Sequence, residues 1–311
     1  ATIGGMGSLI GTPPNALFAA QVSTAYGVEI GFAQWAAVGL PISAVLLLIA
    51  WVSLAKVSPG MRQDDLTVSF GRGLQPMSRA ERRVAVIAAI TALAWISRPL
   101  VEWFIPTVGL TDAGIAMLAA IALFAIPGDP GERLLDWESA ATLRWDVLIL
   151  FGGGLALAGI LETTGLAAWI GARVETLDHL PELLLLTTIA ALIVYIGELA
   201  SNTAMAAIFL PIAGSAALSL NVDPVIFMLP VALAASIGFM LPVATPPNAI
   251  VFGGTKLITI PKMARHGIVL NLVGAVIITL VCYFTVNPRT GLGARPDGLT
   301  PAPAQAASIA N

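Results

Sequence analysis

The chain has 311 residues, of which 57% are hydrophobic and only 11% are charged, with a net charge of −3 and a mean hydropathy of +0.89. Soluble domains carry about 25% charged residues, so this composition excludes an ordinary soluble enzyme and indicates a chain solvated mainly by lipid. The single Cys282 excludes an intramolecular disulfide, and two histidines are too few for an ordinary zinc site.

The first predicted elements surround a break in an apolar run. The string Thr-Pro-Pro-Asn-Ala occupies residues 12–16, inside the charge-free run of residues 1–28. A proline pair removes two backbone donors, and the groups that it frees need partners other than lipid. We therefore expect a half-helix at about 13–25, next to a protein-buried or water-filled site, and a full span at 31–56.

A polar segment and a second group of spans follow. Residues 56–83 contain six of the 15 basic residues, which predicts a cytoplasmic loop by the positive-inside rule. Spans are then expected at about 80–98, 111–127 and 144–161, with an amphipathic segment at about 163–178. Tryptophans near the predicted span ends, among them Trp35, are expected to anchor the chain at the membrane interface.

A polar tripeptide interrupts the next apolar region. Ser201-Asn202-Thr203 separates an arm at 182–199 from an arm at 204–219. At about 1.5 Å per residue, arms of roughly 16 residues reach about 24 Å, which is short of a hydrocarbon core about 30 Å thick. The pattern therefore predicts a re-entrant hairpin with the tripeptide at its tip.

The last elements repeat the first ones. A helix is expected from 224 to 241, and the string Thr-Pro-Pro-Asn-Ala then recurs at residues 245–249. A break at 242–248, a half-helix to about 258 and a span at 264–286 complete the pattern. One such string would usually be a turn, but two broken helices in corresponding halves indicate the binding site of a secondary transporter.

The hairpin tip has the chemistry of an ion site. Helix N-termini attract anions, whereas unwound carbonyls and helix C-termini suit a small hard cation such as Na⁺. The spans contain no lysine or arginine placed to pair with a carboxylate, so neutral donors, helix dipoles and co-bound cations are expected to hold an anionic substrate. Glu198 has two readings, as a coupling carboxylate or as a structural hydrogen-bond acceptor.

These motifs resemble a known family. The Ser-Asn-Thr tripeptide, followed 42 residues later by Thr245-Pro246-Pro247-Asn248 and preceded by Gly11-Thr12-Pro13-Pro14-Asn15, is similar to the signatures of divalent anion/sodium symporters. The similarity extends over essentially all of residues 1 to about 286. It implies an all-α polytopic membrane protein, a homodimer of the inverted-repeat elevator type, which carries dicarboxylates, citrate or sulfate.

The resemblance also implies domains and site residues. The implied domains are a transport domain at 1–56 and 179–286, a cytoplasmic loop at 57–83, and scaffold spans with an amphipathic connecting helix at 84–178, while the Pro/Ala-rich composition of 287–311 predicts a disordered tail. The implied substrate contacts are Ser201, Asn202, Thr203, Thr245, Pro246, Thr12 and Pro13. The implied Na⁺ ligands are Gly11, Asn15, Ala200, Ser201, Asn202, Ala244 and Asn248. Gly197 departs from the family, which commonly has a hydroxyl residue there, because glycine offers only its carbonyl.

The spacing of the repeats has a further implication. Because Thr12 and Thr245 are 233 residues apart, a first hairpin matching Ser201 would lie about 44 residues before Thr12, ahead of residue 1. The chain is therefore expected to be a fragment of a longer transporter that lacks the first scaffold helices and the first hairpin.

The predicted function is Na⁺-coupled symport of di- or tricarboxylates, succinate-like acids first, across a bacterial-type cytoplasmic (inner) membrane. The alternative is a sulfate transporter or a cation-independent dicarboxylate exchanger of the same fold. The expected partners are a small anion, the lipid bilayer and a second copy of the chain, with no nucleic acid. An ion channel fits paired broken helices less well. An intramembrane enzyme is disfavoured because the chain has no His-Glu-x-x-His motif and no serine with an intramembrane histidine partner.

Overall fold

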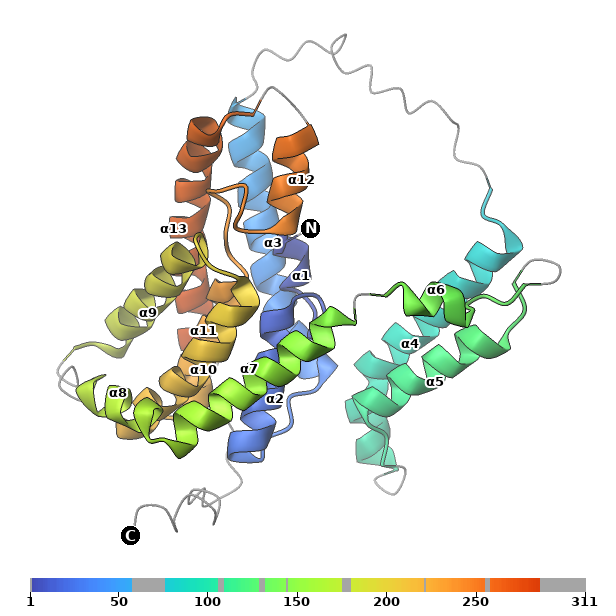
Figure 1. Cartoon of the computed structure of the whole chain (residues 1–311), viewed down its shortest axis with the longest axis horizontal. Coiled ribbons are helices and arrows are strands. Elements are labelled where there is room, and N and C mark those ends of the chain that lie inside the picture. The colour runs from blue at the N-terminus through green and yellow to red at the C-terminus, as the bar shows by residue number, and fades with distance from the viewer. Residues whose placement is uncertain are drawn as a thin grey trace. The chain divides into compact units, whose positions relative to one another are not determined.

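The computed structural model describes residues 2–57, 76–105, 109–128, 132–143, 145–174, 180–220, 222–254 and 258–285. Apart from an isolated bridge between Pro127 and Arg133, the regular structure in these ranges is helical (Figure 1). Most of the predicted loop at 57–83 and the whole predicted tail at 287–311 lie outside the described residues. The helices are α1 (Thr2–Gly5), α2 (Pro13–Tyr26), α3 (Phe32–Val57), α4 (Arg79–Phe104), α5 (Asp112–Ala125), α6 (Trp137–Ala141), α7 (Asp146–Thr163), α8 (Leu166–Val174), α9 (Glu182–Gly197), α10 (Asn202–Ser219), α11 (Pro224–Ala235), α12 (Pro246–Gly254) and α13 (Ile260–Thr285).

Several of these helices are long and apolar enough to cross a membrane. Four pass by length and composition, namely α3, α4, α10 and α13, and α7 with α8 forms a bent pair at 68°. The prediction of an all-α polytopic membrane protein is confirmed at this level. Helix α10 begins at Asn202, within the tripeptide, so the second arm has 18 residues. That is about 27 Å at 1.5 Å per residue, and length alone therefore does not separate a hairpin arm from a span.

The chain forms two compact units. The first contains residues 1–30, 34–53 and those from 146 on, and the second contains 31–33 and 54–145. Within the first unit, α10 packs on α11, α8, α7 and α2, whereas α9 packs on α13 and α11. Residues 146–174 thus pack with α10, although the sequence groups them with the scaffold. Compactness does not decide which segments move together in transport, so the scaffold and transport domains stay predictions.

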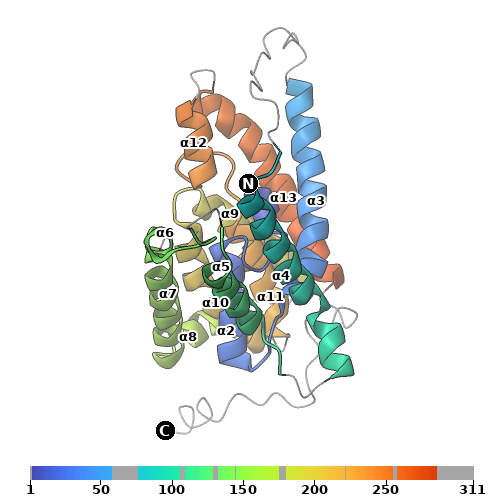
Figure 2. The same cartoon turned by 90° about the vertical axis from the view of Figure 1, so that its right-hand side faces the viewer.

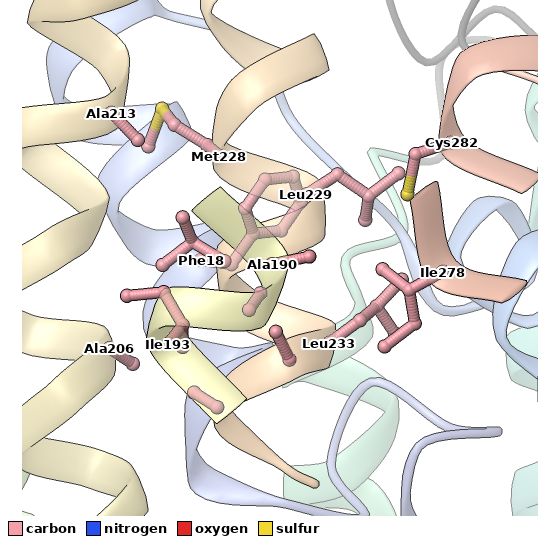
Figure 3. Close-up of a cluster of buried hydrophobic side chains, with 14 of the residues drawn as sticks. Phe18, Ala190, Ile193, Ala206, Ala213, Met228, Leu229, Leu233, Ile278 and Cys282 are labelled. Carbon is pink, nitrogen blue, oxygen red and sulfur yellow. The ribbon is translucent and has the colours of Figure 1, made fainter. Parts of the chain in front are cut away.

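Helix α11 is the centre of the first unit. Every residue of α11 except Ile226 is buried, as expected for a helix that is apolar on all sides. Figure 3 shows Met228, Leu229 and Leu233 of α11 among side chains from several other helices. These neighbours are Phe18 of α2, Ala190 and Ile193 of α9, Ala206 and Ala213 of α10, and Ile278 and Cys282 of α13.

The predicted end of this helix at residue 241 was wrong. Helix α11 ends at Ala235, and tighter turns follow, in which the Ser236 amide donates to Leu233 and the Ile237 amide to Ala234. The apolar pattern continues to residue 241, but side chains distant in sequence accept the next amides. Hydropathy alone could not reveal this end, because it depends on tertiary hydrogen bonds.

The second unit exposes apolar helix surface. Helix α4 begins with a capping box between Ser78 and Glu81 and has no buried residue. Its apolar side chains include Leu93 and Trp103, which are 66% and 76% exposed. Only lipid or protein can favourably cover such a helix in a membrane.

Candidate functional site

The two predicted breaks are closed by the same side-chain brace. The Asn15 amide donates from Nδ2 to the carbonyls of Gly5 and Ser8, at 3.3 and 2.8 Å. The Asn248 amide donates to the carbonyls ten and seven residues before it, those of Gly238 and Leu241, at 2.7 and 3.1 Å. The offsets are ten and seven in both breaks, so each loop has an equivalent pair of carbonyls held by the asparagine of its Thr-Pro-Pro-Asn string.

In each half, the long helix that follows the half-helix, α3 or α13, supports the loop from the side. In the first half, α3 directs Ser43 Oγ to the Ile3 carbonyl at 2.8 Å and Trp35 Nε1 to the Met6 carbonyl at 2.9 Å. Trp35 is only 1% exposed and packs against Phe18, with ring centroids 5.6 Å apart. The prediction that Trp35 anchors the membrane interface was wrong, because its indole is needed inside as a donor to the broken backbone.

In the second half the supporting side chains act on amides. The Phe239 amide donates to Asn271 Oδ1 of α13 at 3.2 Å. The Met240 and Leu241 amides donate to the two carboxylate oxygens of Glu198, at 2.9 and 3.0 Å. Asn271 Nδ2 also donates to Glu198 Oε1, at 2.5 Å. The structure therefore shows Glu198 as a hydrogen-bond acceptor whose partners lie outside the hairpin, a role that is compatible with a carboxylate acting on a cation.

A glycine in α3 and another in α13 let each loop approach these helices closely. A Cβ built on Gly39 of α3 would collide with the Met6 carbonyl, and one on Gly267 of α13 would collide with the Phe239 carbonyl. The helices α3 and α13 run side by side in both views (Figures 1 and 2), and Leu46 Cδ2 lies 3.8 Å from where a Gly274 Cβ would be. The two loops are thus attached to neighbouring helices.

The first and second breaks meet within the same compact unit. Thr12 Oγ1 lies 2.9 Å from Ser236 Oγ, at the point where α11 leads into the second break. Helix α2 packs on both α10 and α11. The predicted site residues of the first half therefore border those of the second, although more than 220 residues separate Thr12 from Ser236.

Two helices at the site have a hydroxyl residue at the N-cap position whose side chain makes no capping hydrogen bond. Thr12 precedes α2 and Ser201 precedes α10, and neither side chain accepts a hydrogen bond from its own helix. An N-cap hydroxyl normally accepts from the second or third amide of its helix, so the first turn of α10 keeps donors for another acceptor. In α2 the prolines at residues 13 and 14 have no N–H, and the Asn15 backbone amide donates to the Thr12 carbonyl. At α12, by contrast, Thr245 Oγ1 accepts a hydrogen bond from the backbone N–H of Asn248 at 3.4 Å.

The predicted substrate contacts differ in exposure. Thr203 and Thr245 are buried, at 5% and 3% exposed. Thr12, Pro13 and Asn202 are partly buried, whereas Ser201 and Pro246 are exposed.

Unpartnered oxygens suit a cation at this place. Asn15 Oδ1 and Asn202 Oδ1 are buried, and within the described part of the chain neither accepts a hydrogen bond. A buried carbonyl oxygen without a donor is costly, and an ion that binds it would remove the cost. Of the other predicted Na⁺ ligands, Ala244 is buried, Ala200 and Asn248 are partly buried, and Gly11 and Ser201 are exposed. The oxygen-rich set thus fits a hard cation.

The residue that departs from the family pattern faces free space. Gly197 is buried, yet a Cβ built on it would meet no neighbouring atom within 4 Å. A hydroxyl residue would therefore fit there without a collision.

Sequence reasoning missed three residues that shape the site, namely Ser43, Ser236 and Asn271. Each is a polar side chain that is at most 4% exposed and lies in or beside an apolar helix. Isolated polar residues inside predicted spans are the signal that could have identified them, since a buried polar group requires a partner.

Comparison with known proteins bears directly on this arrangement. Residues 1–286 match the family described as the sodium:sulfate symporter transmembrane region. The chain belongs to this family. The resemblance to divalent anion/sodium symporters is thereby confirmed, and the chain is an integral membrane protein of a transport family.

Similar proteins include curated staphylococcal members of the family. The chain is 40% identical over 303 residues to the sodium-dependent dicarboxylate transporter SdcS of Staphylococcus saprophyticus subsp. saprophyticus. It is 41% identical over 304 residues to SdcS of Staphylococcus aureus strains USA300 and N315. In each case the match covers 94% of this chain and 58% of the relative, so the chain spans less than two thirds of their length.

Proposed function

We propose that the whole protein is a secondary active transporter that moves a di- or tricarboxylate, succinate-like acids first, together with Na⁺ across a bacterial cytoplasmic membrane. The observation that carries the proposal is the meeting of two identically braced Thr-Pro-Pro-Asn breaks beside the uncapped N-terminus of α10. Broken helices at membrane depth are the usual binding sites of secondary transporters.

The proposed anion site uses neutral donors. The first turn of α10 offers backbone amides, and the N-termini of α2 and α10 carry the positive ends of their helix dipoles. The side chains of Thr12, Ser201, Asn202, Thr203 and Thr245, with Pro13 and Pro246 beside them, would contact the substrate. A carboxylate held only by neutral groups is more stable beside a bound cation, which favours coupling to an ion.

Na⁺ is the proposed coupling ion. The names of the staphylococcal relatives support this choice, as do the unpartnered oxygens of Asn15 and Asn202. The proposed ligands are Gly11, Asn15, Ala200, Ser201, Asn202, Ala244 and Asn248. Bound Na⁺ would supply positive charge next to the substrate carboxylate, while the braces of Asn15 and Asn248 hold the loop carbonyls in place.

The proposed motion and assembly are those of the family. An inverted-repeat elevator would carry the site, in segments 1–56 and 179–286 with the hairpin tip re-entrant, past a scaffold in residues 84–178. A homodimer would cover part of the apolar surface of the second unit, where α4 has no buried residue. The alternatives are a sulfate transporter or a cation-independent exchanger, since a hairpin tip offers the same donors to sulfate as to a carboxylate.

Uptake of labelled succinate by proteoliposomes containing the full-length protein tests the proposal. Uptake that requires an inward Na⁺ gradient and fails with K⁺ supports symport, with unlabelled sulfate and citrate as competitors. Uptake that ignores Na⁺ and requires internal dicarboxylate contradicts symport in favour of exchange. Sulfate uptake without succinate uptake contradicts the substrate class.

Two variants test the site itself. We expect Asn202→Ala and Thr203→Ala to abolish anion binding while expression and dimer formation are unchanged. Thr187→Val is the matched control, because the exposed Thr187 hydroxyl donates only to the Leu183 carbonyl of its own helix. Normal uptake by both site variants would contradict the assignment.

A further inference from the structure

Three consecutive amides in the second break have their acceptors in two side chains. The amides of residues 239–241 donate to Asn271 Oδ1 and to both oxygens of Glu198. Two successive amides, those of Met240 and Leu241, converge on one carboxylate, as amides do in an anion-binding nest. In this protein the anion is a side chain of the chain itself.

The Glu198 carboxylate is deeply buried among neutral donors. It is 3% exposed, and its three hydrogen-bond donors are two backbone amides and the Asn271 carboxamide, none of which is charged. Burying a carboxylate is costly unless a positive charge or several hydrogen bonds compensate it. Among the described residues, hydrogen bonds alone compensate it, so the negative charge stays available to a nearby cation.

This carboxylate lies beside residues proposed to bind the cation. A Cβ built on Gly238 would lie 4.0 Å from Glu198 Cδ and 3.2 Å from Ala244 Cβ, so the carboxylate and Ala244 flank the same glycine. Glu198 is also two residues before Ala200 at the hairpin tip, and Figure 1 shows the segment after α11 passing the end of α9. The clamp formed by Glu198 and Asn271 therefore joins the tip, the second break and α13.

From this geometry we infer that Glu198 is a positioning residue for the coupling cation. Its oxygens hold the amides of Met240 and Leu241 against the hairpin tip, which fixes the distance between the carbonyls of Ala200 and Ala244. Its charge attracts the ion without a direct bond, since most of its acceptor positions are already used. This role rests on the proposed Na⁺ coupling.

Removal of the Glu198 charge should change how strongly Na⁺ stabilises the protein. Glu198→Gln keeps the shape of the side chain but loses the charge and turns one acceptor into a donor that faces a backbone amide. We expect the Na⁺ concentration for half-maximal thermal stabilisation of the purified full-length protein to rise roughly tenfold, the amount that a charged hydrogen bond contributes. Succinate affinity at saturating Na⁺ should change little.

A second variant separates position from charge. Asn271→Leu leaves Glu198 charged and its two backbone donors in place but removes the bridge to α13. The half-maximal Na⁺ concentration should rise in this variant as well, by less than in Glu198→Gln. If Glu198→Gln yields no folded protein, Asn271→Leu carries the test, and an unchanged Na⁺ dependence in it overturns the inference.

The matched control is Glu162→Gln in the same unit. Glu162 is a partly buried carboxylate that accepts from Gln21 Nε2 at 2.6 Å, outside the site, so its removal should leave the Na⁺ dependence unchanged. Melting temperatures are compared in NaCl and choline chloride at constant ionic strength. If Glu198→Gln melts at a lower temperature but its half-maximal Na⁺ concentration equals that of the wild type, the inference is overturned, because that is the result expected of a purely structural clamp. A wild-type protein whose melting temperature ignores Na⁺ overturns the proposed coupling and this role together.

Discussion

The two broken helices share one brace but differ in how the rest of the loop is satisfied. In the first break, Ser43 and Trp35 of α3 donate to the carbonyls of Ile3 and Met6. In the second, Glu198 and Asn271 accept from the amides of residues 239–241. A broken helix frees both carbonyls and amides. The supporting side chains bind carbonyls in the first break and amides in the second.

This difference places a buried charge in one break only, among the described residues. The donors that support the first break are neutral, so that loop is held without a formal charge. The second break includes the carboxylate of Glu198, which is 3% exposed. The shared asparagine brace thus determines the loop shape in both halves, and the supporting side chains determine the local electrostatics.

The largest effect is expected from removing the shared brace. Asn15→Leu should lower the free energy of unfolding by about 2–4 kcal/mol, because two carbonyls lose their donor in a fully buried place. Asn248→Leu should cost less, because Asn248 is partly exposed and water can replace the lost donors. Thermal melts of the full-length protein measure both, with Thr187→Val as control. If Asn248→Leu lost more free energy of unfolding than Asn15→Leu, the expected difference between the two breaks would be contradicted.

The next effect concerns the glycines that let the loops approach α3 and α13. Gly39→Ala and Gly267→Ala should each cost about 1–3 kcal/mol, because the new methyl group meets a backbone carbonyl that cannot swing away. Gly152→Ala in α7 is the control, since its Cβ would meet nothing within 4 Å and alanine favours the helix. If all three variants have the wild-type melting temperature, the close approach of loop and helix is not required.

A smaller effect is expected where the two halves touch. Thr12→Val removes the hydrogen bond between Thr12 and Ser236 and should cost about 0.5–1.5 kcal/mol. Ser236→Ala should cost a similar amount, and a double-mutant cycle should give a coupling of about 1 kcal/mol. Additive losses would mean that the two hydroxyls do not depend on each other.

The smallest effect on stability is expected at Gly197. Gly197→Ser should leave the melting temperature close to that of the wild type, because the added atoms have free space. The new hydroxyl would add an oxygen beside the hairpin tip, so the half-maximal Na⁺ concentration should fall. A rise in that concentration would show that a hydroxyl at residue 197 does not improve cation binding.

Much of the fold could be predicted from local signals. The start of α2 at Pro13 follows from its prolines, which are tolerated in the first turn of a helix but not further inside it. Helix α12 begins in the same way at Pro246, inside the break that was predicted at 242–248. Apolar runs predicted α3 and α13 to within four residues at each end. The end of α11 was missed by six residues, because hydropathy does not register the tertiary partners of residues 239–241.

The sequence by itself determined the membrane class, the two breaks and the family, because composition, proline pairs and a repeated string are properties of short segments. Only the tertiary structure decided that Trp35 points inward, that Asn15 and Asn248 close their loops at the same offsets, and that Glu198 holds the second break. The physical reason is that a broken backbone must find donors and acceptors wherever the fold brings them. Those partners come from up to 43 residues away, as in the bond from the Leu241 amide to Glu198.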